Sequence, residues 1–137
     1  MALMDVFNIA GSALSAQTVR MNVTASNLAN VDSTGSSPER TYRARQPLFE
    51  PMLGHFMDAG QGVGVRVAGI VESQVALRQQ YQPDHPDANE QGYVYLSNVD
   101  PIEEMANMIS ASRAYQNNVE IVNAAKEMLL RTLSLGQ

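Results

Sequence analysis

The sequence predicts a mainly α-helical fold, in which two long terminal helices enclose a small region of β-strands and loops. Both ends of the chain carry apolar residues at alternating spacings of three and four, which is typical of one face of a helix. The middle instead holds most of the prolines and glycines and two short alternating runs, which indicate strands and turns. We expect the two helices to pair as a coiled-coil-like α-helical hairpin, with the β and loop region inserted between them.

The chain has 137 residues, which suits one compact unit better than two independent domains. We expect three segments. Residues 1–37 hold the N-terminal helix of a helical assembly domain, residues 38–97 form a small β and loop middle region, and residues 98–137 hold the C-terminal helix of the assembly domain.

The first segment contains no proline before Pro38 and one glycine within its helical stretch. The helix is predicted to end near residues 27–30, because the following residues (VDSTGSSP, 31–38) are dense in turn formers. Its apolar stripe is weakened by Gln17 and Thr24 and widened by small alanines. The large residues of this stripe are Leu3, Phe7, Leu14, Met21 and Leu28.

The middle region has few large apolar residues, so any sheet in it is expected to be small. Residues 41–45 alternate, and Pro47 and Pro51 then bracket a short apolar pair. Residues 63–71 alternate with period two and predict a strand, and residues 92–96 predict a second, shorter strand.

The last segment carries the clearest helix signals in the chain. Asp100 suits the N-cap, Pro101 the first helical position and Glu103 the capping-box position. No further proline or glycine occurs before Gly136, so the helix is predicted from Pro101 to about Leu133. Its stripe on three-four spacing includes Met105, Met108, Tyr115, Val119, Val122, Leu129 and Leu133.

Other apolar residues broaden the stripe of the last helix well beyond the seam of a two-helix coiled coil. A small middle region cannot cover a helix of this length, so the remaining apolar surface is expected to meet other subunits. We therefore predict a structural subunit that forms a homo-oligomer. The large stripe residues of the two helices are its predicted assembly seam.

Composition argues against several other functions. The chain has no cysteine, which excludes a disulfide framework and a thiolate site. Its net charge is −5 and no segment is strongly basic, so a nucleic-acid partner is not expected. The N-terminal stretch has no basic residue before Arg20 and carries Asp5, so neither a cleaved signal peptide nor a membrane span is predicted.

No residue pattern predicts a catalytic, cofactor or metal site. Asp84, His85, Asp87 and Glu90 lie close in sequence, but their spacing matches neither a calcium loop nor a zinc site, so a structural turn is expected. His55 stands alone and is expected at the surface.

Two further patterns have ordinary structural interpretations. Gly60, Gly62 and Gly64 lead into a strand rather than a helix, which favours a hairpin or bulge over a phosphate-binding loop. Residues 40–45 contain three arginines beside a tyrosine, and in an acidic chain this cluster favours an ion-pair surface between subunits over nucleic-acid binding.

Two alternatives stay open at this point. An enzyme is disfavoured because no nucleophile, base and orienting group occur in a recognised context. A binding module that forms a discrete coiled-coil dimer would need only a narrow apolar seam, whereas the subunit of a tube needs several contact faces.

Several motifs resemble the bacterial flagellar axial proteins of the rod and hook. The segment SNLAN at 26–30, followed by Thr34 and Gly35, is similar to their N-terminal signature. The segments DHPDA at 84–88, GYV at 92–94 and EMANMISASRAYQNNV at 104–119 resemble the rod members in particular.

The resemblance covers essentially the whole chain. It implies a subunit of the proximal rod, in the periplasmic part of the flagellar basal body, exported by the type III apparatus without a cleaved signal. It also implies a hollow helical tube of paired terminal helices that transmits torque and passes exported subunits. The implied partners are other rod proteins and adjacent basal-body or export-gate components, with no cofactor.

Overall fold

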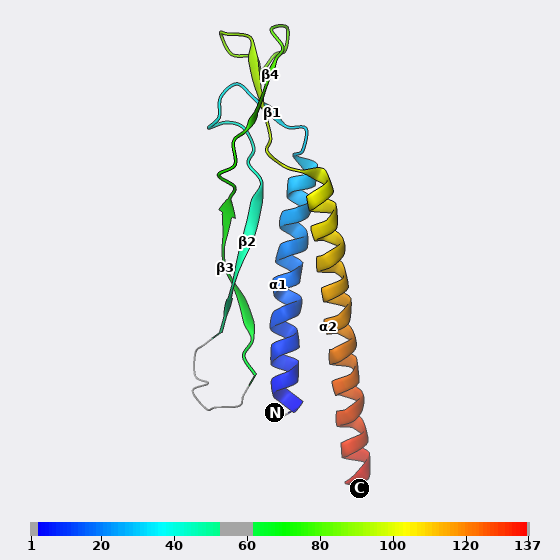
Figure 1. Ribbon diagram of the computed structural model, residues 1–137. Coiled ribbons are helices and arrows are strands. Elements are labelled where there is room, and N and C mark those ends of the chain that lie inside the picture. Colours follow the sequence, from blue (N-terminus) through cyan, green and yellow to red (C-terminus); the bar gives the residue numbers. More distant parts are fainter. Residues whose placement is uncertain (1–2, 53–61, 137) are drawn as a thin grey trace.

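The fold consists of two long helices with a small antiparallel β region between them in sequence, as expected. Figure 1 shows the computed structural model, in which residues 3–52 and 62–136 are described. The elements follow the order α1, β1, β2, β3, β4, β5 and α2.

Helix α1 spans Leu3–Ala29, so its end falls where the turn-forming residues were predicted to stop it. The chain leaves the helix through two tight turns. In these turns the Asn30 backbone N–H donates to the Asn27 carbonyl at 3.1 Å, and the Ser33 N–H donates to the Asn30 carbonyl at 3.2 Å.

Helix α2 spans Pro101–Leu135, two residues beyond its predicted end. The Asp100 carboxylate accepts hydrogen bonds from the backbone N–H groups of Ile102 at 2.9 Å and Glu103 at 3.3 Å. The predicted N-cap is therefore confirmed, because these are two of the donors that a helix start leaves without a partner inside the helix.

Strands β2 (Arg45–Pro51) and β3 (Val65–Glu72) form an antiparallel hairpin. The strand predicted at residues 63–71 is confirmed with slightly shifted bounds. Strand β2 runs through Pro47, whereas the two prolines were expected to bracket a short segment. A two-stranded ribbon tolerates proline because each strand has one free edge, where a missing N–H breaks no ladder bond.

A second sheet holds β1 (Thr34–Gly35), β5 (Tyr93–Leu96) and β4 (Arg78–Tyr81) in that order, all antiparallel. Only β5 was predicted from the sequence. Gly92, just before β5, has φ of 82°, and a Cβ there would lie 2.8 Å from the Tyr81 ring, so the tight return from β4 requires glycine at this position.

The elements lie in a long, narrow arrangement (Figure 1). Helices α1 and α2 pack side by side, and the β2–β3 hairpin lies along α1 on the side away from α2. The three-stranded sheet lies at one end of the helical pair, and both chain termini lie toward the other end.

One well-buried part of the described chain lies where the sheets meet the helices. The largest fully buried side chains there are those of Val94, Asn27 and Ser97. Two of the three are polar, so this junction depends on hydrogen bonds as well as on apolar packing.

Candidate assembly surface

Helix α1 has two buried sides, and the apolar stripe in the sequence marks only one of them. On the side of the hairpin, the Ser12 hydroxyl accepts a hydrogen bond from the backbone N–H of Val65 in β3 at 3.1 Å. Asn27 bonds the backbone of β2 on the same side. Ala16 and Val23 are buried and share this side, because Ala16 follows Ser12 by four residues and Val23 precedes Asn27 by four residues.

The contact between the two helices contains small and polar side chains at its most buried positions. By helical spacing, the buried residues Ala10 and Thr24 lie on the predicted stripe of α1. The buried residues of α2 are Glu104, Ala111 and Ala125, which are separated by seven and fourteen residues. A seven-residue repeat of this kind places them along one seam that faces α1.

Three polar side chains also lie at this contact. The Arg20 guanidinium donates to the side-chain oxygen of Asn107 at 3.1 Å, which joins α1 to α2. The side-chain oxygen of Gln17 is buried and has no hydrogen-bond partner among the described residues. A buried acceptor without a partner weakens a contact, because it has lost its hydrogen bond to water.

The structure places the twelve predicted seam residues in two groups. Most of them are half-buried, and Met105, Leu129 and Leu133 are exposed. Their role in assembly stays a prediction, because a single subunit has no neighbour against which they could pack. The half-buried members are Leu3, Phe7, Leu14, Met21, Leu28, Met108, Tyr115, Val119 and Val122.

Large apolar side chains of α2 lie on the surface of the subunit on more than one side of the helix. Ile102, Met105 and Ile109 share one side, because they are three and four residues apart. Ile121 and Met128 are seven residues apart and lie on another side. We call the complete group the exposed apolar set of α2. It consists of Ile102, Met105, Ile109, Ile121, Met128, Leu129, Leu130, Leu133 and Leu135.

The C-terminal part of α2 carries over half of this set. Ala125 is the last buried residue of α2, and every described residue after it is exposed. Helix α2 has 35 residues and α1 has 27, so α2 is longer by 8 residues, or about 12 Å. Its C-terminal end extends past the start of α1 (Figure 1). Nothing in the described chain covers this overhang.

The arginine-rich segment contacts its own chain at two of its three arginines. The Arg43 guanidinium donates to the Ser73 and Val75 carbonyls at 3.2 and 3.3 Å. Arg45 lies 3.4 Å from the carboxylate of Glu72. These contacts border a polar depression of about 550 Å³. The cluster thus has structural partners inside the subunit, and its predicted role between subunits stays a prediction.

The loop at residues 82–92 is held by hydrogen bonds that suit a turn. The Thr34 hydroxyl donates to the Asp87 carboxylate at 2.6 Å, and the backbone N–H of Asp87 donates to Nδ1 of His85 at 3.0 Å. Within residues 3–52 and 62–136, no three acidic or histidine side chains gather as metal ligands would. His55 and Gly60 lie outside the described residues.

Neither helix of the described chain is long and apolar enough to cross a lipid bilayer.

Two family models match the sequence. The model described as "Flagella basal body rod protein" matches residues 7–35, which cover most of α1 and the turn after it. The model "Flagellar basal body rod FlgEFG protein C-terminal" matches residues 90–135, which cover β5 and α2. Both models describe flagellar basal-body rod proteins.

Full-length relatives define the family more narrowly. The chain is 49% identical to the flagellar basal-body rod protein FlgC of Salmonella typhimurium over 100% of both chains, and 49% identical to that of Escherichia coli O6:H1 with the same coverage. It is 36% identical to FlgC of Borreliella burgdorferi over 100% of this chain and 99% of the relative. The chain therefore belongs to the FlgC family. It is a structural subunit of the rod in the flagellar basal body, not an enzyme.

Proposed function

We propose that this subunit belongs to the proximal rod and assembles through its terminal helices, with copies of itself and with other rod proteins. The product would be a hollow shaft that transmits torque and passes exported subunits. In the shaft, α1 and α2 pair in the manner of a coiled coil, and adjacent basal-body or export-gate components contact the shaft at its base.

The exposed apolar set of α2 is the observation that carries this proposal. Leu130 is 56% exposed and Leu133 is 63% exposed, although both are large apolar residues. Fully burying one such side chain contributes about 1.5–3 kcal/mol. The set occupies more than one side of α2, so one partner helix cannot bury all of it. An assembly with several neighbours around each subunit can.

The same observation weighs against a discrete coiled-coil dimer, which buries a single narrow seam. Sedimentation of the purified subunit over a concentration series separates the two possibilities. A dimer reaches a plateau in size, whereas a shaft subunit grows or stays monomeric until its partners are present.

The packing of α1 supports export without loss of the N-terminal stretch. The small residues that could imitate a signal-peptide cleavage site, Ala13 and Ala16, lie in the middle of α1. Cleavage there would remove Ala10, which is buried, and Ser12, which bonds the hairpin. We propose that the mature subunit in the periplasmic part of the basal body keeps these residues.

Leu130→Asp tests the assembly proposal in a motile bacterium that relies on this subunit. The Leu130 side chain is 56% exposed in the single subunit, so the fold of the monomer should change little. In the shaft, the replacement loses about 1.5–3 kcal/mol of burial and places a carboxylate in an apolar contact. Because the cost recurs in every copy, we expect loss of swimming and absence of the subunit from purified basal bodies.

The matched control is Glu127→Gln, which changes an exposed charged residue three positions earlier and should swim normally. The amount of exported subunit is measured in both strains, so that an export defect is not mistaken for an assembly defect. Normal swimming of the Leu130→Asp strain would show that the overhang of α2 contacts no neighbour.

A further inference from the structure

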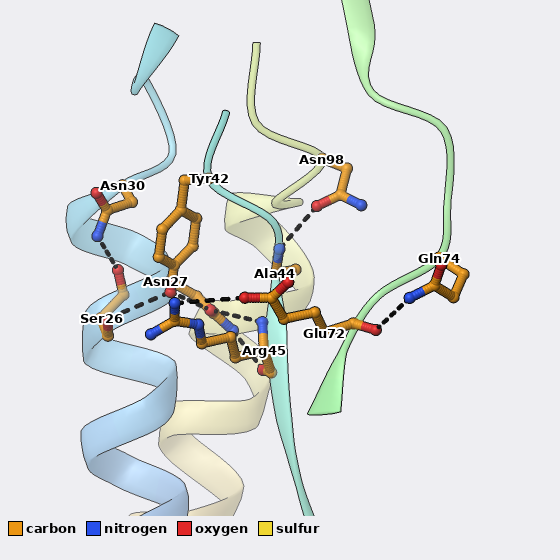
Figure 2. Close-up of polar contacts among 9 residues, drawn as sticks. All are labelled: Ser26, Asn27, Asn30, Tyr42, Ala44, Arg45, Glu72, Gln74 and Asn98. Atoms are coloured by element: carbon orange, nitrogen blue, oxygen red, sulfur yellow. Dashed lines mark hydrogen bonds and ion pairs between the residues drawn. The ribbon is translucent and has the colours of Figure 1, made fainter. Parts of the chain in front are cut away.

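The side chain of Asn27, near the end of α1, takes the place of a β-strand beside β2. Its Oδ1 accepts from the Arg45 backbone N–H at 2.9 Å, and its Nδ2 donates to the Arg45 carbonyl at 2.8 Å (Figure 2). A neighbouring antiparallel strand makes this same pair of bonds with one residue. Because the N–H and C=O of one strand residue point to the same side, both groups of Arg45 face α1 and not β3.

Two neighbours fix the orientation of this amide. The Tyr42 hydroxyl donates to Asn27 Oδ1 at 2.8 Å, and the Ser26 hydroxyl lies 3.2 Å from the same tyrosine oxygen. Both lone-pair positions of Oδ1 are then occupied. A rotated amide would point its N–H group at the Arg45 N–H and its oxygen at the Arg45 carbonyl, so the backbone of Arg45 permits only one arrangement. The Arg45 guanidinium lies over the Tyr42 ring, 5.3 Å from the ring centre.

A second asparagine holds the residue just before Arg45. Asn98 Oδ1 accepts from the Ala44 backbone N–H at 2.7 Å, and Asn98 Nδ2 donates to the Val75 carbonyl at 2.9 Å. Asn98 lies two residues before Asp100, the N-cap of α2. The consecutive residues Ala44 and Arg45 are therefore tied to the end of one helix and to the approach of the other. We call Asn27, Tyr42, Ala44, Arg45 and Asn98 the asparagine elbow (Figure 2).

The asparagine elbow lies where β2 begins, so its geometry sets the direction in which the hairpin runs. The hairpin then follows α1 toward the chain termini (Figure 1). Near its other end the Ser12–Val65 hydrogen bond fastens it again.

We propose that Asn27 is a positioning residue that, with Asn98, locks the β2–β3 hairpin against the helical pair so that the two move as one rigid body. The proposal rests on the rod function proposed above, in which load must pass between neighbours through each subunit. Asn27 is enclosed by its own subunit and is not a surface residue. It is 1% exposed and its amide makes all of its described bonds inside the chain.

The chain offers a direct reporter of this lock. A Cβ built on Gly64, next to β3, would lie 3.4 Å from the Cβ of Ser12 on α1. Disulfides join Cβ atoms about 3.5–4.5 Å apart, so Ser12→Cys with Gly64→Cys can form a bond when the hairpin is docked. The natural chain has no cysteine, so no other thiol competes.

The experiment compares the cysteine pair with and without Asn27→Ala, in full-length subunits within purified basal bodies. The rate of cross-linking under mild oxidant is followed on non-reducing gels. We expect Asn27→Ala to slow cross-linking several-fold, and the exposed control Asn22→Ala on the same helix to leave the rate unchanged. Equal rates with and without the Asn27→Ala substitution would overturn the proposal.

Swimming provides the second readout. We expect Asn27→Ala cells to lose most of their swimming-ring expansion and to regain it once the cysteine pair is oxidised. Either single cysteine in the same background should give no rescue. Normal swimming of Asn27→Ala cells, or failure of a fully formed cross-link to restore it, would overturn the role of the lock. Absence of the unsubstituted subunit from basal bodies would instead contradict the proposed rod function.

Discussion

The seam between α1 and α2 and the outer surface of α2 are built from different residues. The seam buries alanines, a threonine and a glutamate most deeply, whereas large side chains such as Ile109 and Leu133 remain exposed on the same helix. Burial free energy scales with apolar area, so the exposed large side chains of α2 offer neighbours more apolar area per residue than the small residues at the centre of the seam provide. We expect a subunit made this way to gain much of its helical order from assembly.

The largest effect is expected when the subunit is diluted to a monomer, because the helices then lose their contacts with neighbouring subunits. We expect amide hydrogen exchange to be fast over residues 3–29 and 101–135 in the dilute monomer, and slow over the same residues in purified basal bodies. The reason is that most helical stability in proteins comes from packing of an apolar face. Strong protection of both helices in a proven monomer would show that the seam is sufficient by itself.

Gln17→Leu should strengthen the contact between α1 and α2 within one subunit. The substitution removes a buried oxygen that has no partner among the described residues, an arrangement that costs about 1–3 kcal/mol. We expect the dilute monomer to gain helical circular dichroism. Gln116→Leu, at an exposed position of α2, is the control and should change it little. Equal helicity of parent and Gln17→Leu subunits would mean that water donates a hydrogen bond to Oε1 of Gln17.

Asp100→Ala separates the contribution of the N-cap to the stability of α2 from the contribution of packing against neighbours. The Asp100 carboxylate accepts from two backbone N–H groups, and loss of such a cap costs about 0.5–2 kcal/mol. The amides of Ile102 and Glu103 should then exchange faster in assembled subunits, with the later turns of α2 unaffected. Asp100→Ser should restore most of the protection. If Asp100→Ala spreads fast exchange along the whole of α2, the cap and not the neighbours controls this helix.

The smallest effect is expected at Glu39, a residue outside both helices. A backbone hydrogen bond, and next a bond with the Ser37 hydroxyl, lower the pKa of the exposed Glu39 below its ordinary value of 4.5. A lowered folded pKa contributes stability above the unfolded value that is lost as pH falls through the folded value. In Ser37→Ala the pKa measured by NMR should rise toward 4.5. An unchanged pKa would mean that the backbone bond alone controls this carboxyl.

The sequence predicted the helices well because their signals are local. The Asp100–Pro101 start, the turn formers after residue 30 and the long stretch without proline act within one or two turns of helix. The strands were predicted less completely. β4 has four exposed, mostly polar residues and β1 has two residues, so neither carries the apolar alternation that marks a strand.

The candidate assembly surface was predicted in part. Spacing identified the apolar residues that share a helix face but could not show which of them a single subunit buries. It also missed the second buried side of α1, because Ser12 and Asn27 are polar and signal nothing by hydropathy. Their partners in β2 and β3 are more than 15 residues away in sequence.

The sequence alone therefore determined the two helices, their apolar character and the resemblance to flagellar axial proteins. These properties follow from short-range backbone preferences and from motifs that can be read residue by residue. Only the tertiary structure decided that the hairpin lies along α1 and that the polar side chain of Asn27 is fully buried beside β2. Those outcomes depend on pairing between distant backbone groups, and periodicity shows which residues share a face without showing what covers that face.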